Sequence, residues 1–185
     1  LISILSTNVD KEVIDNGENL KIIANYGAGF NNVDVDYARE KNIDVTNTPK
    51  ASTAATAELT FGLVLAVARR IVEGDKLSRT KGFDGWAPLF FRGREVSGKT
   101  LGIIGFGEIG SAVAKRAKGF DMDILYTGPH QKKEKEREIG AKYVDLDTLL
   151  EHSDFITINA AYNPDIHHMI DSEQFKKMKS TAYLV

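Results

Sequence analysis

A glycine-rich turn is the feature of the sequence whose residue types and spacing most clearly suggest chemistry, in the segment 99–118, KTLGIIGFGEIGSAVAKRAK. The spacing G-x-G-x-x-G, between an apolar stretch and a helical one, is the arrangement that cradles the pyrophosphate of a dinucleotide. Gly105 would form the turn, Gly107 would let the backbone approach the phosphates, and Gly110 would allow close helix packing. The helix that follows would point its positive end at the phosphates, although a purely structural turn is the alternative. The predicted cofactor contacts are Gly105, Gly107, Glu108, Ile109 and Gly110.

A second loop, NAAYNP at 159–164, follows the fourth strand that we predict after residue 99. In a doubly wound sheet the ligand lies where the strand order reverses, between the first and fourth strands. This loop should therefore face the glycine turn, and its small residues leave room for a ribose and a nicotinamide. An ordinary turn of the sheet is the alternative. The predicted contacts here are Ala160, Ala161 and Tyr162.

The end of the second predicted strand, LYTGPHQKK at 125–133, lacks the Asp or Glu that usually binds the adenosine 2′-hydroxyl of NAD. Thr127 and Gly128 occupy the acidic place, and His130 and Lys132 come just beyond. A missing carboxylate removes repulsion of a 2′-phosphate, and nearby cations attract one, so the sequence favours NADP(H) over NAD(H). The alternative is that this charged run is a solvated helix face with compensating charges.

Strands and helical stretches alternate along the chain, and this pattern predicts an α/β fold with parallel sheets. After residue 99 the series suits a Rossmann-type doubly wound sheet of strand order 3-2-1-4-5. Before residue 50 the alternation of strand, helix and strand predicts part of a smaller, flavodoxin-like α/β domain. The candidate strands of the Rossmann-type sheet are LGIIG, DILYT, KYV, DFITIN and TAYLV.

A glycine-rich stretch without periodicity places the predicted domain boundary near Glu95. Residues 1–95 would form part of a substrate (catalytic) domain, including one long interdomain helix at about 54–79. Residues 96–185 would form the N-terminal part of the dinucleotide-binding domain. Trp86 is expected to anchor the stretch before the boundary.

The composition favours a small-molecule partner over a macromolecular one. The chain has 24 basic and 26 acidic residues, which gives no electrostatic case for nucleic acid or for an anionic membrane surface. The longest apolar run, Leu59 to Ala68, has about half of the roughly 20 residues that a membrane-spanning helix needs. No cysteine occurs, so a disulfide framework is excluded and a reducing cytoplasm fits. The scattered histidines do not suggest a metal site.

Four ordered motifs carry a resemblance to a known family: NYGAGFNNVDVDYAREKNIDVTNTP, TAELTFGLVLAVARR, FDGWAPLFFRGREVSGKTLGIIGFGEIG and MKSTAYLV. The chain resembles the D-isomer-specific 2-hydroxyacid dehydrogenases over essentially all of its length, and most of all their glyoxylate/hydroxypyruvate reductase branch. The resemblance implies an NAD(P)-dependent oxidoreductase that transfers hydride between the cofactor and a small 2-oxo acid to give a D-2-hydroxy acid. Because the family includes a transcriptional corepressor, a non-catalytic dinucleotide-sensing binding protein is the alternative.

The resemblance also implies roles for individual residues. It implies that Gly27, Ala28 and Gly29 present backbone N–H groups to the substrate carboxylate, and glycines after a strand can cradle an anion in this way; a tight turn without a ligand is the alternative. It implies a contact on the nicotinamide side at Thr56, where capping of a helix start is equally consistent. The family's His-x-Pro-x-Thr pattern is replaced by NAAYN at 159–163, which leaves backbone contacts to the cofactor there.

No catalytic residue of the family maps onto the chain. The arginine, glutamate and histidine that the resemblance implies would lie beyond Val185, so we expect these 185 residues to be the interior of a longer enzyme and inactive alone. The resemblance further implies a homodimer through the long helix, with candidate contacts at Phe61, Val64 and Leu65. Burial within the monomer is the alternative for these three side chains.

Overall fold

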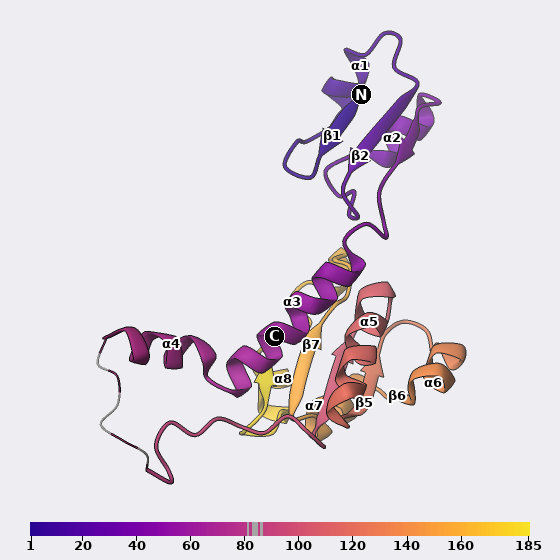
Figure 1. Ribbon diagram of the computed structural model, residues 1–185. Coiled ribbons are helices and arrows are strands. Elements are labelled where there is room, and N and C mark those ends of the chain that lie inside the picture. Colours follow the sequence, from indigo (N-terminus) through magenta and orange to yellow (C-terminus); the bar gives the residue numbers. More distant parts are fainter. Residues whose placement is uncertain (81, 83–84, 86) are drawn as a thin grey trace. The chain divides into compact units, whose positions relative to one another are not determined.

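A computed structural model describes residues 1–80, 82, 85 and 87–185 of the chain (Figure 1). Trp86, the expected anchor before the domain boundary, lies outside the described residues. The chain divides into two compact units, Leu1–Thr53 and Ala54–Val185, which we call unit 1 and unit 2. Each unit is an α/β structure with its own parallel sheet, as the sequence predicts.

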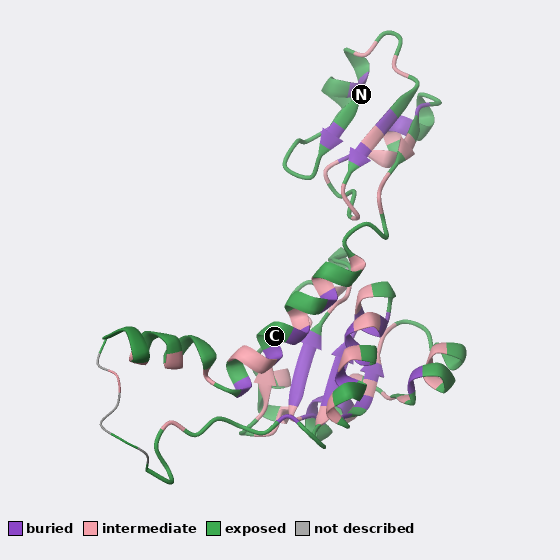
Figure 2. Ribbon diagram, viewed as in Figure 1, coloured by how far each residue is buried: buried purple, intermediate pink, exposed green. Residues whose placement is uncertain are grey.

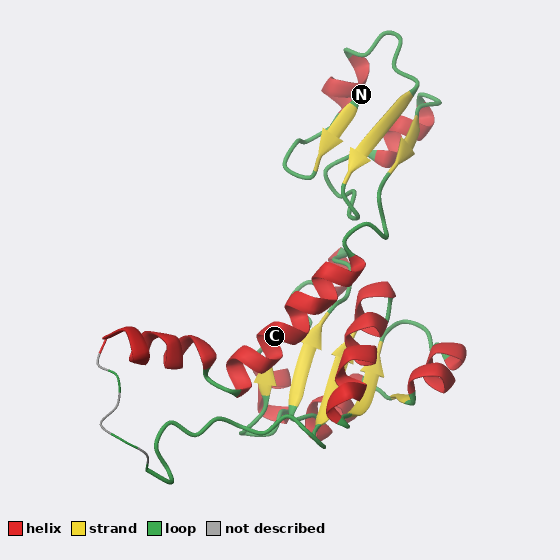
Figure 3. Ribbon diagram, in the orientation of Figure 1, coloured by secondary structure: helices red, strands yellow, loops and turns green. Residues whose placement is uncertain are grey.

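Unit 1 has a parallel three-stranded sheet in the order β1-β2-β3 (Figure 3). Both of its helices begin at an aspartate whose carboxylate accepts a backbone hydrogen bond, Asp10 from Val13 (3.1 Å) and Asp34 from Tyr37 (3.0 Å). The first helix is absent from the sequence prediction because it is only five residues long. The elements are β1 Ile2–Ile4, α1 Lys11–Asp15, β2 Ile22–Tyr26, α2 Val35–Glu40 and β3 Asp44–Thr46.

Unit 2 has a parallel five-stranded sheet in the order β6-β5-β4-β7-β8, which confirms the predicted order 3-2-1-4-5. Its strands are β4 Thr100–Ile104, β5 Asp123–Thr127, β6 Ala141–Tyr143, β7 Phe155–Ile158 and β8 Tyr183–Leu184. Its helices are α3 Thr53–Ala68, which begins one residue before the unit, α4 Ile71–Thr80, α5 Glu108–Ala117, α6 Lys133–Ile139, α7 Leu146–His152 and α8 Ser172–Lys177, with short 3₁₀ turns at Lys118–Phe120 and Pro164–Ile166.

Helices cover both faces of the unit 2 sheet, and the burial of the strands follows from this (Figures 1 and 2). Leu101 and Ile103 of β4 share one apolar cluster with residues of α3 and α5, whereas Ile104 shares another with residues of α7. Alternate residues of a strand point to opposite faces, so a strand with a helix layer on each side is apolar throughout. The continuous apolar run of β4 therefore places the glycine turn after it at the carboxyl edge of a fully covered sheet.

The predicted single helix at about 54–79 is wrong, because the structure has two helices that are separated at Arg69 and Arg70. Arg70 has a left-handed φ of 56°. The Arg94 N–H donates to the Ala68 carbonyl oxygen (2.7 Å), and Gly93 lies so close that a Cβ there would be 2.8 Å from Arg69 Cα. Packing from a distant part of the sequence thus accompanies the end of α3.

The first of these two helices, α3, packs with unit 2. In the sequence, the boundary between the two compact units therefore lies about forty residues before the predicted boundary near Glu95. Phe61 lies against Phe120 with ring centroids 5.0 Å apart, and Glu58 pairs with Arg116 at 2.9 Å. These contacts join α3 to the end of α5 and to the 3₁₀ turn that follows it. The assignment of residues 1–95 to a substrate domain stays a prediction.

The helix face that we predicted for a dimer is turned inward. Phe61 and Val64 are buried in the unit 2 core, and Leu65 packs against the same core. The alternative, burial within the monomer, is therefore the correct one for these side chains. The outward apolar residues of α3 are instead Leu59, Leu63 and Val67. No helix within the described ranges is long and apolar enough to cross a membrane.

Candidate functional site

Two of the three glycines in the turn after β4 are required by packing alone. Gly105 has a φ of 91°, and a Cβ there would lie 2.5 Å from the Ala160 backbone nitrogen. A Cβ at Gly110 would overlap the Gly105 carbonyl oxygen. The Gly105 N–H also donates to the Thr127 carbonyl oxygen at 3.0 Å, which ties the turn to the end of β5. These two glycines shape the turn whether or not a ligand binds.

Packing within the protein does not require a glycine at the middle position, Gly107. Gly107 has an ordinary φ of −80°, and a Cβ there would meet nothing within 4 Å. It stands directly before α5 and supplies no side-chain hydrogen bond to the first turn of that helix. The N–H groups of a helix start point out of the helix end, where they favour an anion. Open space beside them, kept clear by the missing side chain, fits the pyrophosphate of a dinucleotide.

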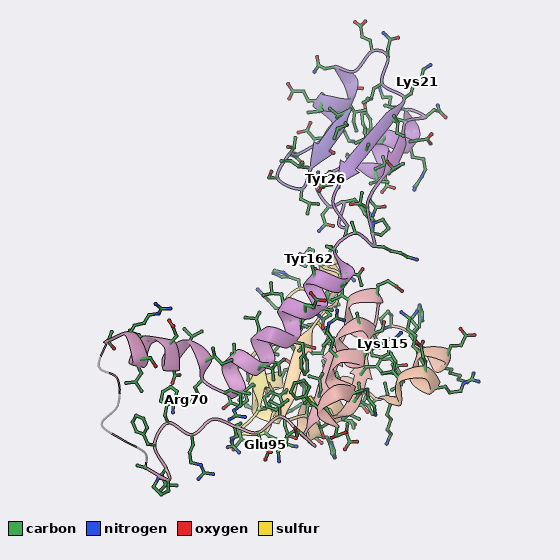
Figure 4. The ribbon with its side chains drawn as sticks, in the orientation of Figure 1. Lys21, Tyr26, Arg70, Glu95, Lys115 and Tyr162 are labelled. Carbon is green, nitrogen blue, oxygen red and sulfur yellow. The ribbon has the colours of Figure 1, made fainter. Side chains whose placement is uncertain are left out.

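The loop after β7 meets this turn, as predicted. The Asn159 N–H donates to the Ile104 carbonyl oxygen at 2.7 Å, and Ala160 lies against Gly105. The Asn159 side-chain oxygen is buried and has no hydrogen-bond partner among the described residues. A buried acceptor of this kind gains a partner when a ligand brings a donor such as a ribose hydroxyl or a carboxamide. Ala161 and Tyr162 are exposed, and Figure 4 labels Tyr162 at the end of unit 2 where α3 begins.

A buried tyrosine that the sequence analysis missed organises the loop after β5. The Tyr126 hydroxyl accepts a hydrogen bond from the Lys132 N–H (2.7 Å) and donates one to Glu136 Oε1 (2.8 Å). Burial raises the pKa of Tyr126 to about 12, so the hydroxyl keeps the proton that it donates. Its ring stacks on Phe106 of the glycine turn, with centroids 4.0 Å apart. The available signal was an aromatic pair, one in the turn and one in the next strand.

The residues that were predicted on the adenosine side of the cofactor lie at the end of β5 and in the loop after it. The Gly128 carbonyl oxygen accepts from the Tyr143 hydroxyl (3.0 Å), and Thr127 ends β5 beside the glycine turn. A surface hollow of about 410 Å³ has the run Gln131–Lys135 as its described lining, which includes the predicted Lys132 but neither Thr127 nor Gly128. His130 is exposed and is outside that lining. The hollow is therefore bordered by lysines and by no histidine in its described part.

The predicted nicotinamide-side residue, Thr56, is the fourth residue of α3 and lies inside the helix. Its carbonyl oxygen accepts from the Thr60 hydroxyl at 2.9 Å, an ordinary bond within a helix. Capping of a helix start, the alternative explanation, does not apply at this position. Arg116 of α5 reaches the Ala54 carbonyl oxygen (3.4 Å) and so ties the first turn of α3 to the helix that follows the glycine turn.

The loop after β2 in unit 1 contains the three residues that were predicted to bind the substrate carboxylate. The carbonyl oxygens of its three predicted residues all accept hydrogen bonds within the protein: Gly27 from Thr48 N–H (2.9 Å), Ala28 from Asn47 Nδ2 (2.8 Å) and Gly29 from Asn25 Nδ2 (2.9 Å). The Gly27 N–H donates to the Asn25 carbonyl oxygen (2.9 Å), so it does not face a substrate carboxylate as predicted, whereas the N–H groups of Ala28 and Gly29 donate to no other described residue. Two successive N–H groups without internal acceptors form a concavity that can hold a carboxylate.

Comparison with known proteins identifies the family of this chain. The family model described as D-isomer specific 2-hydroxyacid dehydrogenase, NAD binding domain, matches residues 61–185. The chain belongs to the D-isomer-specific 2-hydroxyacid dehydrogenase family. A relative from Staphylococcus haemolyticus that carries the family-level name 2-hydroxyacid dehydrogenase is 90% identical over 185 residues, which are 100% of this chain and 58% of the relative. The chain thus spans less than two thirds of the length of the curated relatives it matches.

Solved structures of D-2-hydroxyacid dehydrogenases and related proteins share the fold. A protein of Thermus thermophilus matches 100% of this chain and 58% of its own with 38% identity and a TM-score of 0.92. D-lactate dehydrogenase from Aquifex aeolicus, complexed with NAD and lactic acid, matches 99% of this chain and 54% of its own, with 32% identity and a TM-score of 0.89. An acyclic imino acid reductase in complex with NADPH and D-Arg matches 99% and 58%, with 31% identity and a TM-score of 0.86.

Membership of this dehydrogenase family accounts for the NAD-binding character of residues 61–185 and for the Rossmann-type sheet. In the described part of the chain no group of three or more His, Asp or Glu side chains is placed to hold a metal ion. The individual contacts of the two loops with cofactor and substrate remain predictions, supported by the geometry of each loop.

Proposed function

We propose that the protein is a reductase of small 2-oxo acids that uses a nicotinamide cofactor and yields D-2-hydroxy acids. The observation that carries this proposal is the open space at Gly107, beside the start of α5, in a unit whose sheet and sequence belong to this dehydrogenase family. Glyoxylate or hydroxypyruvate is the proposed substrate, because the four sequence motifs resemble that branch most closely. A cytoplasmic location suits a chain without cysteine.

In this proposal each loop has one task. The glycine turn and the first turn of α5 hold the pyrophosphate, and Ala160 and the Asn159 side-chain oxygen face the nicotinamide ribose. The reduced cofactor, when bound, supplies the hydride. The N–H groups of Ala28 and Gly29 hold the carboxylate of the 2-oxo acid and so fix the orientation of its carbonyl carbon. The proton donor is expected beyond Val185.

We propose NADP(H) as the preferred cofactor. Thr127 stands where NAD-dependent relatives of this fold usually have a carboxylate, and Lys132, five residues later, lines the hollow formed by Gln131–Lys135. The fold alone does not decide the preference, because solved relatives are complexed with NAD in one case and with NADPH in another. In this proposal the preference for NADP(H) over NAD(H) therefore depends on the charges at and after the end of β5.

We also propose a homodimer that forms through the outward face of α3. Leu59, Leu63 and Val67 recur at intervals of four residues and are 65%, 44% and 39% exposed, so they form an apolar stripe along one side of the helix. Sedimentation of Leu63→Glu should give a monomer where the wild type gives a dimer. A wild-type monomer would contradict the proposal.

The test of the function is the oxidation of NADPH and NADH by the purified full-length protein, not by these 185 residues alone, with glyoxylate, hydroxypyruvate and pyruvate as separate substrates. Turnover with a preference for NADPH supports the proposal in full. Saturable cofactor binding without turnover would instead favour the dinucleotide-sensing alternative. Thr127→Asp should lower the NADPH to NADH preference about tenfold by repelling the 2′-phosphate. An unchanged ratio would mean that Thr127 does not lie next to that group.

A further inference from the structure

Lys135 of α6 reaches the start of α5, although it was not among the predicted cofactor contacts. Its ammonium nitrogen lies 2.9 Å from Ser111 Oγ, 3.0 Å from Glu108 Oε1 and 3.4 Å from the Gly107 carbonyl oxygen. The side chain is 31% exposed, so it is partly shielded from water. A lysine from a neighbouring helix is thus fixed beside the middle glycine of the turn.

The same lysine lines the hollow in the segment after β5. That hollow of about 410 Å³ is bordered by Lys132, Lys133 and Lys135 together with Gln131 and Glu134. Lys135 is the member of this set that also contacts the glycine turn. A ligand with its pyrophosphate at Gly107 and its adenosine toward the hollow would pass Lys135, and the anionic group on the adenosine side is a 2′-phosphate.

Glu108 supplies the negative charge at this position. It is the first residue of α5, where a carboxylate is favoured by the helix dipole, and it pairs with Lys135 at 3.0 Å. A phosphate carries more charge than a carboxylate and offers three acceptor oxygens, so it competes well for the same ammonium group. A bound dinucleotide would also bring its own negative charge close to the Glu108 carboxylate.

We propose that Lys135 is a specificity-determining residue that exchanges its Glu108 partner for the 2′-phosphate of the cofactor. This inference rests on the proposed use of NADP(H). Lys132 also lines the hollow, and the Tyr126 hydroxyl accepts a hydrogen bond from its backbone N–H. The 2′-phosphate would then have two lysines of the same hollow as candidate partners.

A purely structural role for Lys135, as a tie between α5 and α6, makes a different prediction. The chain offers a matched control for it, since Lys115 of α5 pairs with Glu138 of α6 at 2.6 Å. This pair joins the same two helices through the same kinds of group, toward the end of α5 away from the glycine turn. Lys115→Met removes a tie without removing a charge from the hollow.

The experiment is calorimetric titration of the purified wild type, Lys135→Met and Lys115→Met with NADPH, NADH, 2′,5′-ADP and 5′-ADP. Lys135→Met should weaken NADPH and 2′,5′-ADP about tenfold or more, and NADH and 5′-ADP by less than about twofold. Lys115→Met should leave all four affinities unchanged. Glu108→Gln should tighten 2′,5′-ADP by about threefold, because the competing carboxylate is gone.

Two results would overturn the inference. Equal weakening of all four ligands by Lys135→Met would assign the lysine to the pyrophosphate or to the helix tie, and no weakening would assign it no part in binding. Both leave the proposed reductase function intact. If the wild type binds none of the four ligands, the proposed function fails together with the inference. If it discriminates 2′,5′-ADP through Lys135 but reduces no 2-oxo acid, the inference stands and the reductase proposal fails.

Discussion

Two glycine loops follow parallel strands in this chain, and they are held by different means. The turn 105–110 after β4 is fixed by backbone contacts with the ends of β5 and β7 and continues into the ten-residue helix α5. The loop 27–29 after β2 is fixed by side-chain amides, chiefly Asn25 and Asn47, and no helix follows it directly. The anion site that we propose for the first loop uses a helix end, and the one that we propose for the second uses two loop N–H groups.

This difference indicates where each loop is sensitive. In the turn after β4 the glycines themselves are the critical positions, because any Cβ at Gly105 or Gly110 meets backbone. In the loop after β2 the asparagines are critical, because the amides of Asn25 and Asn47 hold two of the three loop carbonyls. Four experiments test this contrast.

Substitution of the open glycine should have the largest effect on binding. Gly107→Val places a side chain in the space assigned to the pyrophosphate, so the cofactor Kd should rise by about a hundredfold or more, which is about 2.7 kcal/mol. The thermal unfolding midpoint should change little, because nothing lies within 4 Å of the new Cβ. Gly119→Val, at an exposed glycine with equally open surroundings, is the control and should bind normally. A wild-type Kd for Gly107→Val would remove the pyrophosphate from this turn.

Removal of the buried amide should be the largest perturbation of unit 1. Asn25 is 1% exposed, and its side chain bonds Ser3 Oγ (2.9 Å), the Gly29 carbonyl oxygen (2.9 Å) and the amide of Asn32. Asn25→Ala leaves these partners unsatisfied, so the free energy of unfolding of unit 1 should fall by about 2 kcal/mol. Hydrogen exchange should rise in β1–β3 and stay unchanged in β4 and β7. Asn16→Ala, which removes an exposed amide bond to Glu12, should have little effect.

The loop glycine should affect substrate binding alone. Gly29→Ala adds a methyl group whose nearest neighbour, Leu5 Cδ2, is 3.9 Å away, so the free energy of unfolding should stay within about 0.5 kcal/mol of the wild type. The methyl group narrows the approach to the N–H groups, and the KM for the 2-oxo acid should rise about tenfold. An unchanged KM in Gly29→Ala would argue against carboxylate binding here.

Alkaline pH should destabilise unit 2 through Tyr126, and this is the smallest of the expected effects. Tyr126 has a pKa raised from 10.0 to about 12 by burial, so the folded chain holds this proton more tightly than the unfolded chain. The contribution of this proton to the free energy of unfolding is fully present below pH 10 and is lost as pH rises toward 12. At pH 11 the free energy of unfolding should be lower by about 1 kcal/mol. Denaturant titration of unit 2 should show this slope, and Tyr126→Phe should lack it. A slope that persists in Tyr126→Phe would come from another group.

The sheet of unit 2 was predictable because its information is local. Most of its strands are apolar runs, and the glycine spacing marks which strand is first, so the order 3-2-1-4-5 follows and is confirmed. The helix face at Phe61 was not predictable in the same way. The stretch around it is apolar on most sides, so the pattern does not say which side faces the core.

The features that escaped the sequence analysis depend on contacts between distant residues. The end of α3 is fixed by Gly93 and Arg94, which stand well beyond any helical period. Lys135 lies in a run of alternating charges, and nothing in that run separates it from the solvated lysines beside it. Asn25 and Asn47 of unit 1 stand in one of the four family motifs, but the sequence predicts no role for them. An amide that binds a backbone carbonyl oxygen has no characteristic spacing in a sequence.

The hydrogen bond between Arg94 and the end of α3 has a consequence for how such a chain can change through evolution. The backbone leaves the core at Ala68 and is anchored to the same residue when it returns at Arg94 (2.7 Å). The stretch between them includes α4, which contributes no buried residue to the core. Insertions or deletions in this detour would leave the register of the sheet untouched.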